Sequence, residues 1–266
     1  MMGLLMDFLA QLGFSARRKV VAALEGLSCY ARFVLAVLAA SGEVLHRPRL
    51  WVAQVFMTGN RSLAIIGVSG LFVGFVLSLQ LYNLLARYGS AELAGLAVNL
   101  ALVRELGPVV TALLFAGRAG TALTAQIGLM KAGEQLTAMD MMGVNPLRRV
   151  MAPRFWGGFV AMPLLAAVFS LAGLLGAWLI VVVLVGVDAG AFWSQMQASV
   201  DWWRDIGQGL IKSVVFGAVV TSIALCVGYE SEPTPEGVAT ATTRTVVLSS
   251  LSILGLDFIL TAFMFA

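Results

Sequence analysis

Five apolar segments, each long enough to cross a lipid bilayer, constrain what this chain can fold into more than any other feature. A membrane-spanning helix needs about 20 mainly apolar residues. Charged residues separate the five segments and are rare inside them. The expected spans cover residues 63–85, 93–127, 159–185, 206–229 and 246–265. The chain is therefore predicted to be an all-α, polytopic membrane protein.

The composition supports this prediction and excludes several classes of function. The chain is 60% hydrophobic and 12% charged, with a mean hydropathy of +0.93, whereas soluble domains carry about 25% charged residues. Its basic residues lie near the ends of the apolar segments, so we expect no nucleic-acid partner. His46 is the only histidine, which disfavours a metal site or a histidine-based catalytic site. Cys29 and Cys226 are expected to be small, buried apolar residues.

No phosphate-binding loop for ATP is found. Such a loop places a lysine directly after a glycine. None of the three lysines, Lys19, Lys131 and Lys212, follows a glycine. We therefore expect this chain to bind no nucleotide cofactor by that route.

The N-terminal region, residues 1–40, places apolar side chains at near-helical spacing with polar residues between them. This pattern favours an amphipathic helix that lies at the membrane surface. We therefore expect an interfacial region over residues 1–50 and a transmembrane region over residues 51–266. The alternative is a tilted span over residues 24–40, which Arg32 would make costly.

The second span, residues 93–127, is longer than a bilayer requires. As one straight helix it would measure about 50 Å, against a hydrocarbon core of about 30 Å. It must therefore bend or protrude into water. Pro108 cannot donate a hydrogen bond to the carbonyl of Arg104, and its ring clashes there, while Gly107 relieves the crowding before the proline. A kink is predicted beside Arg104 and Glu105.

Arg104, Glu105 and Lys212 are ionisable residues inside or close to the spans. At the centre of a membrane helix each would cost about 2.5–3.5 kcal/mol. In one interpretation Arg104 and Glu105 reach the outer interface, or pair with Lys212 only to lock helices together. In the other they line a cavity that holds a polar headgroup, with apolar walls for the lipid tails. Intramembrane charges favour the functional interpretation.

Residues 134–142 form a second amphipathic segment. The segment is polar on one side and rich in methionine on the other, with Met139, Met141 and Met142 as adaptable apolar anchors. It is either a surface connector or a short helix that docks in a groove of a partner. Gly143 is a natural helix stop, and Asn145–Pro146 forms a cap and first turn for the next helix.

The distribution of basic residues predicts the topology. Twelve of the 17 Lys and Arg residues lie in the N-terminal segment or between positions 118 and 154. The positive-inside rule places both regions in the cytoplasm, and five spans then put Ala266 on the opposite side. Asp188, Asp201 and Asp205 on that opposite side match no calcium-binding loop, so we expect them on a solvated surface.

Several motifs occur in an order that resembles a known family. They are Leu102-Val-Arg-Glu-Leu-Gly-Pro-Val-Val110, Leu114-Phe-Ala-Gly-Arg-Ala-Gly120, Glu134-Gln135, Asp201-Trp202 and Ala241-Thr-Thr-Arg-Thr-Val246. The chain resembles the MlaE/YrbE permeases, the transmembrane subunits of Mla-type ABC transporters of Gram-negative bacteria. The resemblance covers essentially the whole chain, is weakest before Gly59, and implies a single ABC permease domain over residues 1–266.

The resemblance also implies partners and a cargo. The family's permease forms a homodimer with a cytoplasmic ATPase subunit, which uses ATP and Mg and in turn binds a small STAS-domain protein. A hexameric MCE-domain protein lies on the outer side. The cargo is phospholipid, moved between the bacterial inner membrane and a periplasmic carrier to maintain outer-membrane lipid asymmetry. The permease itself is not an enzyme.

The family's functional residues can be matched to positions of this sequence. The lipid-pocket residues match Tyr88, Arg104, Glu105 and Leu106, the apolar walls Leu77, Leu84 and Leu85, and polar positions near the cavity Lys212, Asp205 and Arg244. The family's ATPase-coupling helix matches residues 131–143, with Glu134, Gln135, Met139, Asp140 and Met142 as the expected contacts.

Two other classes of function remain open at this point. A secondary transporter or channel driven by an ion gradient is the first, although five spans show no inverted repeat. An intramembrane enzyme acting on lipids is the second, although the sequence has neither a His–carboxylate set nor a nucleophile elbow.

Overall fold

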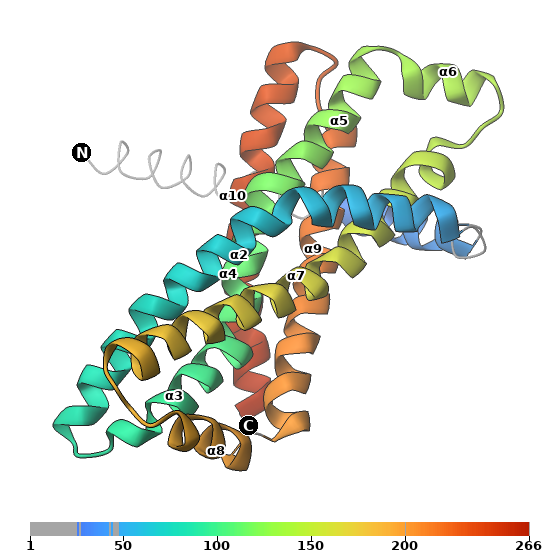
Figure 1. Cartoon of the computed structure of the whole chain (residues 1–266). Helices are drawn as coiled ribbons and strands as arrows, with labels where there is room; N and C mark the ends of the chain where they lie inside the picture. Colours follow the sequence, from blue (N-terminus) through green and yellow to red (C-terminus); the bar gives the residue numbers. More distant parts are fainter. Residues whose placement is uncertain (1–25, 27, 43, 45–47, 200, 266) are drawn as a thin grey trace, which may run out of the picture.

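The computed structural model describes residues 26, 28–42, 44, 48–199 and 201–265, and every regular element in that part of the chain is helical (Figure 1). The all-α prediction is confirmed. The elements are α2 (Pro48–Arg87), η1 (Ala91–Leu93), α3 (Ala94–Leu100), η2 (Ala101–Leu106), α4 (Gly107–Phe115), η3 (Ala116–Gly120), α5 (Thr121–Ala132), α6 (Gln135–Met141), η4 (Leu147–Met151), α7 (Ala152–Trp178), η5 (Leu179–Leu184), α8 (Ala189–Ser199), η6 (Trp202–Gly207), α9 (Gln208–Glu230) and α10 (Pro235–Phe265).

Five helical stretches are long and apolar enough to cross a membrane, as predicted. They run over Arg49–Arg87, Ala94–Ala132, Leu147–Leu184, Trp202–Glu230 and Pro235–Met264. Each continues past the apolar core expected from sequence, because the helix does not end where the first charged residue appears. A helix of 39 residues is about 58 Å long, so it must tilt or extend beyond the bilayer. Helices α6 and α8 lie at opposite ends of these spans (Figure 1), which we call the α6 end and the α8 end.

The second span changes helix type beside Arg104 and Glu105, where the sequence predicts a kink. Residues Ala101–Leu106 form a π-helical segment, and the backbone N–H of Gly107 donates to the carbonyl of Leu102. This wider turn is how the chain accommodates Pro108, which has no N–H to donate. Gly107 has a second reason to be glycine, since a Cβ there would lie 2.5 Å from the Oγ of Ser170 on α7.

Helices α2 and α7 pack in close contact along much of their length. A Cβ on Gly70 would lie 2.6 Å from the carbonyl oxygen of Phe169, and one on Gly74 would overlap the backbone of Gly173. The GxxxG pair on α2 therefore packs directly on α7, as small residues at this spacing allow. A core that includes Phe115, Phe169 and Phe216 fills the space between these helices and their neighbours.

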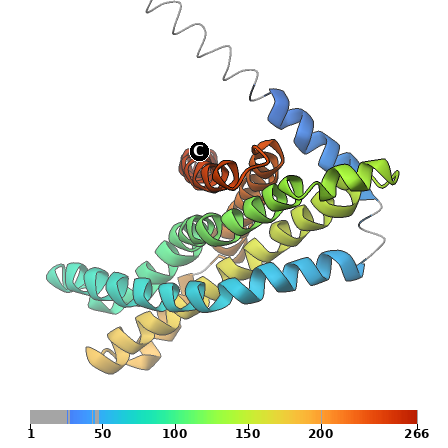
Figure 2. The same cartoon turned by 90° about the horizontal axis from the view of Figure 1, so that it is seen from above.

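The helix Ser28–Gly42 is too short to be a candidate span. Figure 2 shows it side-on while α10 is seen nearly end-on, so the two run in very different directions. The hydroxyl of Tyr30 lies 2.5 Å from that of Ser222, and the ring of Phe33 packs against Tyr229. Within the described residues the helix lies against the α6 end of α9. This agrees with a surface helix and not with a tilted span, while residues 1–25 lie outside the described part.

The two cysteines lie closer together than their sequence separation suggests. The thiol of Cys29 donates to Glu230 Oε1 at 3.3 Å, and that of Cys226 approaches the same oxygen at 3.7 Å. Cys226 is buried as predicted, but the prediction for Cys29 is wrong because its side chain is exposed. The shared carboxylate joins the helix Ser28–Gly42 to the end of α9.

The segment after the second span folds as a short helix with well-defined ends. Helix α6 begins after Glu134, which has a left-handed backbone with φ of 56°. It ends at Met141, shortly before Gly143, whose φ is 75°, and the N–H of Val144 donates to the carbonyl of Met139. Asn145 Oδ1 accepts from the N–H of Leu147 at 2.9 Å. The predicted stop and cap are confirmed.

Candidate functional site

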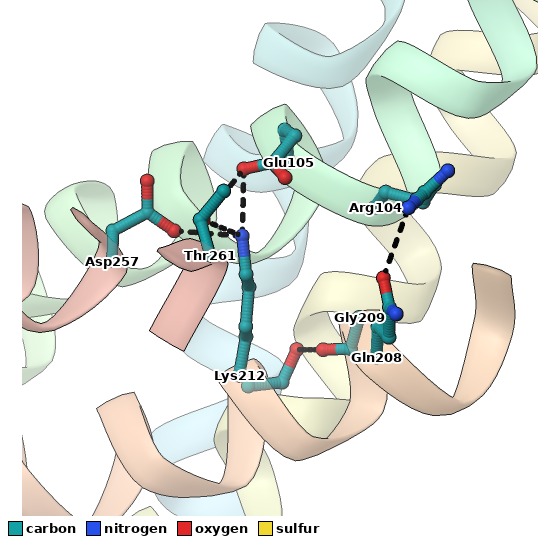
Figure 3. A network of polar contacts seen from close by, with 8 residues as sticks. Arg104, Glu105, Gln208, Gly209, Lys212, Asp257 and Thr261 are labelled. Atoms are coloured by element: carbon teal, nitrogen blue, oxygen red, sulfur yellow. Dashed lines mark hydrogen bonds and ion pairs between the residues drawn. The ribbon is translucent and has the colours of Figure 1, made fainter. Parts of the chain in front are cut away.

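Lys212 is the centre of a cluster of ionisable side chains inside the bundle (Figure 3). Its side chain is 1% exposed, and Nζ donates to Glu105 Oε2 at 2.6 Å and to Thr261 Oγ1 at 2.7 Å. Asp257 Oδ1 lies 3.0 Å from the same nitrogen. A buried ammonium ion is stable only when paired and hydrogen-bonded, and these three groups satisfy that requirement. The cluster joins η2, α9 and α10.

A second pair lies beside the first. Arg104 Nη2 donates to Gln208 Oε1 at 3.2 Å, and Nη1 lies 3.5 Å from Asp205 Oδ1. Asp205 also accepts from the backbone N–H of Asp201 at 2.9 Å. Asp205 is 4% exposed, so the expectation of a solvated side chain is wrong for this residue. Its burial is possible because the guanidinium of Arg104 and a backbone donor face its carboxylate.

The backbone geometry brings these charges together. A Cβ on Gly209 would overlap the carbonyl oxygen of Val103, so α9 and η2 touch without a side chain between them. The π-helical turn of η2 places Arg104 and Glu105 at this contact. Such π turns occur frequently at functional sites. Arg104 therefore faces Gln208, and Glu105 faces Lys212 one turn further along α9 (Figure 3).

The cluster holds two cations and three carboxylates, and around Lys212 the carboxylates are the more accessible side chains. The side chain of Glu105 is 35% exposed and that of Asp257 is 24% exposed, against 1% for Lys212. The cluster therefore presents hydrogen-bond acceptors with a net negative charge. Acceptors of this kind can hold an ammonium group or compete for the buried lysine.

The structure separates the predicted lipid-binding residues other than Arg244 into two groups. Arg104, Glu105, Asp205 and Lys212 belong to the ion cluster, and Leu106 packs on the adjacent core. The residues of α2 form the other group. Leu77 also packs on the core, Leu85 is half-buried, and Leu84 and Tyr88 are 50% and 78% exposed near the α8 end of α2.

Two cavities lie near these groups. Leu84 lines a groove of about 640 Å³ together with Gln80 and Arg87. Asp205 lines a separate cavity of about 490 Å³ with apolar walls from α7 and α9, among them Leu171 and Leu210. The predicted wall residues Leu77 and Leu85 line neither of these two cavities.

Arg244 does not lie with the ion cluster. It is an exposed residue of α10, and 13 positions separate it from Asp257 on the same helix, which corresponds to about 20 Å along the axis. Within one copy of the chain, Arg244 is therefore too far from the cluster to share a headgroup site with it.

Sequence reasoning missed Asp257, Thr261 and Gln208. Asp257 carried a recognisable signal, because it is an acidic residue within the apolar fifth span and such residues are functional candidates by default. Thr261 and Gln208 carried no such signal, since hydroxyl and amide groups are ordinary in membrane helices. Only the packing of α9 against α10 and η2 reveals them.

Helix α6 presents one face to the bundle and the other to solvent. Leu136 is 5% exposed, and Met139 packs with it on a core cluster that contains Val37 and Met151. Met141 and Met142 are 85% and 71% exposed. Glu134, Gln135 and Asp140 are also exposed. Met139 thus attaches α6 to the bundle, whereas Met141 and Met142 are accessible to a partner.

The profile of the family described as "Permease MlaE" matches residues 51–263. The chain belongs to the MlaE permease family. It is 50% identical over 262 residues to the "Intermembrane phospholipid transport system permease protein MlaE" of Haemophilus influenzae, covering 98% of this chain and 99% of that protein.

More distant relatives occur in a cyanobacterium and in a plant. A protein of Synechocystis called a probable ABC transporter permease protein is 32% identical over 248 residues, covering 91% of this chain and 94% of the relative. The protein "TRIGALACTOSYLDIACYLGLYCEROL 1, chloroplastic" of Arabidopsis thaliana is 31% identical over 212 residues, covering 80% of this chain and 60% of the relative. The resemblance seen in the sequence motifs is confirmed at the level of the family.

Proposed function

We propose that this MlaE family member is the transmembrane subunit of an ABC transporter that moves phospholipid between the inner membrane and a periplasmic carrier, and so maintains outer-membrane lipid asymmetry. The observation that carries the proposal is 50% identity to a phospholipid transport permease over essentially the whole of both chains. A secondary transporter or channel is not favoured, because the bacterial relatives are named as permeases of ABC type.

The ion cluster and the cavities are proposed as the lipid path. Arg104, Glu105 and Lys212 would face the headgroup, and the apolar residues of α2 and α7 would face the tails. An ammonium group can bind the accessible carboxylates of Glu105 and Asp257, and a phosphate group can bind the guanidinium of Arg104, which is 21% exposed. The role of these residues rests on the paired geometry and on the family match.

A second copy of the chain is proposed to complete the path. Helix α10 is the least covered span, with 11% of its apolar window buried against 67% for the span Trp202–Glu230. Its exposed side chains include Phe258 and Phe263, which suit contact with lipid or with a second copy.

Helix α6 is proposed to receive the force of ATP hydrolysis in a separate subunit. Its exposed Met141 and Met142 can enter a groove of that ATPase, with Glu134, Gln135 and Asp140 as polar contacts. The α6 end would be cytoplasmic and Ala266 periplasmic, in accordance with the basic residues. The MCE-domain hexamer would lie at the α8 end, and the STAS-domain protein would bind the ATPase.

The test is ATP-dependent lipid movement by the assembled transporter. ATPase activity should copurify with this chain only when the partner subunit is present. Replacing both Arg104 and Glu105 by Ala should reduce bound phospholipid and cell-envelope resistance to detergent. Arg244→Ala is measured in parallel, because Arg244 lies away from the ion cluster. Unchanged bound lipid and unchanged detergent resistance in the Arg104/Glu105 double variant would contradict the role of the cluster.

A further inference from the structure

A groove at the α6 end of the molecule is not explained by the proposed lipid path. It has a volume of about 510 Å³ and lies between the start of α2 and the loop that joins α6 to α7. Val44, Leu50 and Val144 supply apolar walls, and Arg148 and Arg149 supply guanidinium groups. None of its lining residues belongs to the ion cluster, which lies on η2, the first turns of α9 and the last turns of α10.

The electrostatics of the groove favour an anion. Arg148 and Arg149 lie in the first turn of a helical stretch of 38 residues, Leu147–Leu184. The N-terminus of a helix carries a partial positive charge, so cations there are unfavourable and anions favourable. In the described part of the chain no ion pair involves Arg149, and its side chain is exposed. The guanidinium of Arg149, at a helix N-terminus, is stabilised when a negative group binds in the groove beside it.

The apolar walls indicate what kind of anion fits. Leu50 belongs to the first turn of α2, and the long apolar helices α2 and α7 continue from the two sides of the groove into the bundle. A phosphate group with an attached glycerol and acyl chain can use both the guanidinium groups and the apolar walls, whereas free phosphate uses only the former. Basic pockets beside membrane helices bind anionic headgroups in this way.

We propose that this groove binds the phosphate-bearing headgroup of an anionic phospholipid from the membrane leaflet at the α6 end. The lipid is a bound ligand that fixes the junction between α6 and α7, and it is distinct from the transported cargo. The proposal therefore does not depend on the transport function. A free phosphate ion shares the headgroup chemistry and is distinguished by experiment.

The experiment measures lipid retention by the full-length chain without any partner protein. The chain is reconstituted in vesicles of equal phosphatidylglycerol and phosphatidylcholine, extracted in mild detergent, and analysed by native mass spectrometry. Each basic residue near an anionic surface changes the affinity about fivefold. Retained phosphatidylglycerol should thus fall about fivefold in Arg149→Gln and about 25-fold in Arg148→Gln/Arg149→Gln. Arg149→Lys, which keeps the charge, should retain most of it.

Matched controls separate this site from general attraction. Arg61→Gln removes an exposed arginine of α2 that does not line the groove, and it should leave retention unchanged. Inorganic phosphate at millimolar concentration should not displace the lipid from the wild-type chain. Equal loss in Arg61→Gln, or wild-type retention in the double variant, would overturn the proposal. Displacement by phosphate would assign the groove to a free ion and would also overturn it. Thermal unfolding of each variant in detergent shows whether that variant is folded. If the double variant does not fold, the comparison of Arg149→Gln with the charge-conserving Arg149→Lys still tests the proposal.

Discussion

Replacing Lys212 by Met should destabilise this protein far more than an ordinary surface substitution. The replacement keeps the length of the side chain but removes the cation that faces Glu105 at 2.6 Å and Asp257 at 3.0 Å. Removing one partner of a buried ion pair costs about 3–5 kcal/mol, because the other charge stays behind uncompensated. Glu105 and Asp257 are 35% and 24% exposed, so part of that cost is screened by solvent. We therefore expect a loss near the lower bound, about 3 kcal/mol.

The assay is the free energy of unfolding in mixed detergent micelles, measured by tryptophan fluorescence as the fraction of denaturing detergent increases. Glu105→Gln in the Lys212→Met background should cost much less than in the wild type, because the carboxylate no longer has a cation to lose. The coupling energy of this double-mutant cycle is expected to be about 1.5–3 kcal/mol, the range for hydrogen bonds to charged groups. The coupling with Asp257→Asn should be smaller, since Asp257 is in ion-pair contact without a hydrogen bond to Lys212.

The matched control is the replacement of Arg244, another basic residue within a membrane-spanning helix. Arg244 is exposed on α10, and in the described residues it forms no ion pair. Arg244→Met should change the unfolding free energy by less than about 0.5 kcal/mol. Additive effects of Lys212→Met and Glu105→Gln, or a loss for Lys212→Met no larger than that of the control, would refute the reasoning.

Three further predictions concern other parts of the fold. Gly74→Leu should destabilise the chain by at least about 1–3 kcal/mol because its side chain would overlap the backbone of α7, whereas Gly67→Leu, with open space at its Cβ, should not; thermal unfolding in detergent compares them. Met141→Asp should weaken binding of the ATPase about tenfold, a loss of roughly 1.4 kcal/mol at an exposed anchor, as measured by copurification at graded concentrations, while the unfolding temperature of the permease stays unchanged. The pKa of Cys29 is raised, because its thiol donates to Glu230 and faces that carboxylate's negative charge; the hydrogen bond is present while the thiol is protonated and is lost as pH rises through the folded-state pKa. Iodoacetamide at pH 8.5 should therefore alkylate Cys29 more slowly than a free thiol, Glu230→Gln should speed the reaction, and equal rates in both proteins would contradict the contact.

Much of the fold follows from local features of the sequence. The spans, the irregular turn beside Pro108 and the helix stop at Gly143 depend on residues close together in the chain, where apolar length and backbone chemistry act directly. The sequence predicts a kink beside Pro108, and the π turn found there is visible only in the structure. The span limits were too short because charged residues near a helix end extend into water without ending the helix. Arg49 and Arg87 illustrate this, since both are exposed and both lie in α2.

The candidate site could be predicted only in part. Arg104, Glu105 and Lys212 stand out in sequence because each is costly in a membrane. Their actual partners, Gln208, Asp257 and Thr261, depend on how α9 and α10 pack against η2, which is a non-local property. The same reason explains Cys29 and Cys226, which share a carboxylate although 197 positions separate them.

The proposed lipid path can be tested most directly by phospholipid transfer from proteoliposomes that contain this chain and the proposed ATPase subunit. Fluorescent phospholipid is followed from these vesicles to an acceptor carrier, with and without ATP, for the wild type and for Arg104→Ala/Glu105→Ala. Transfer should require ATP and the ATPase, and it should be lost in the double variant while ATP hydrolysis continues. Transfer by this chain alone, or transfer at the wild-type rate in the double variant, would contradict the proposal that a bundle with an intramembrane ion cluster conducts lipid under the control of an ATPase.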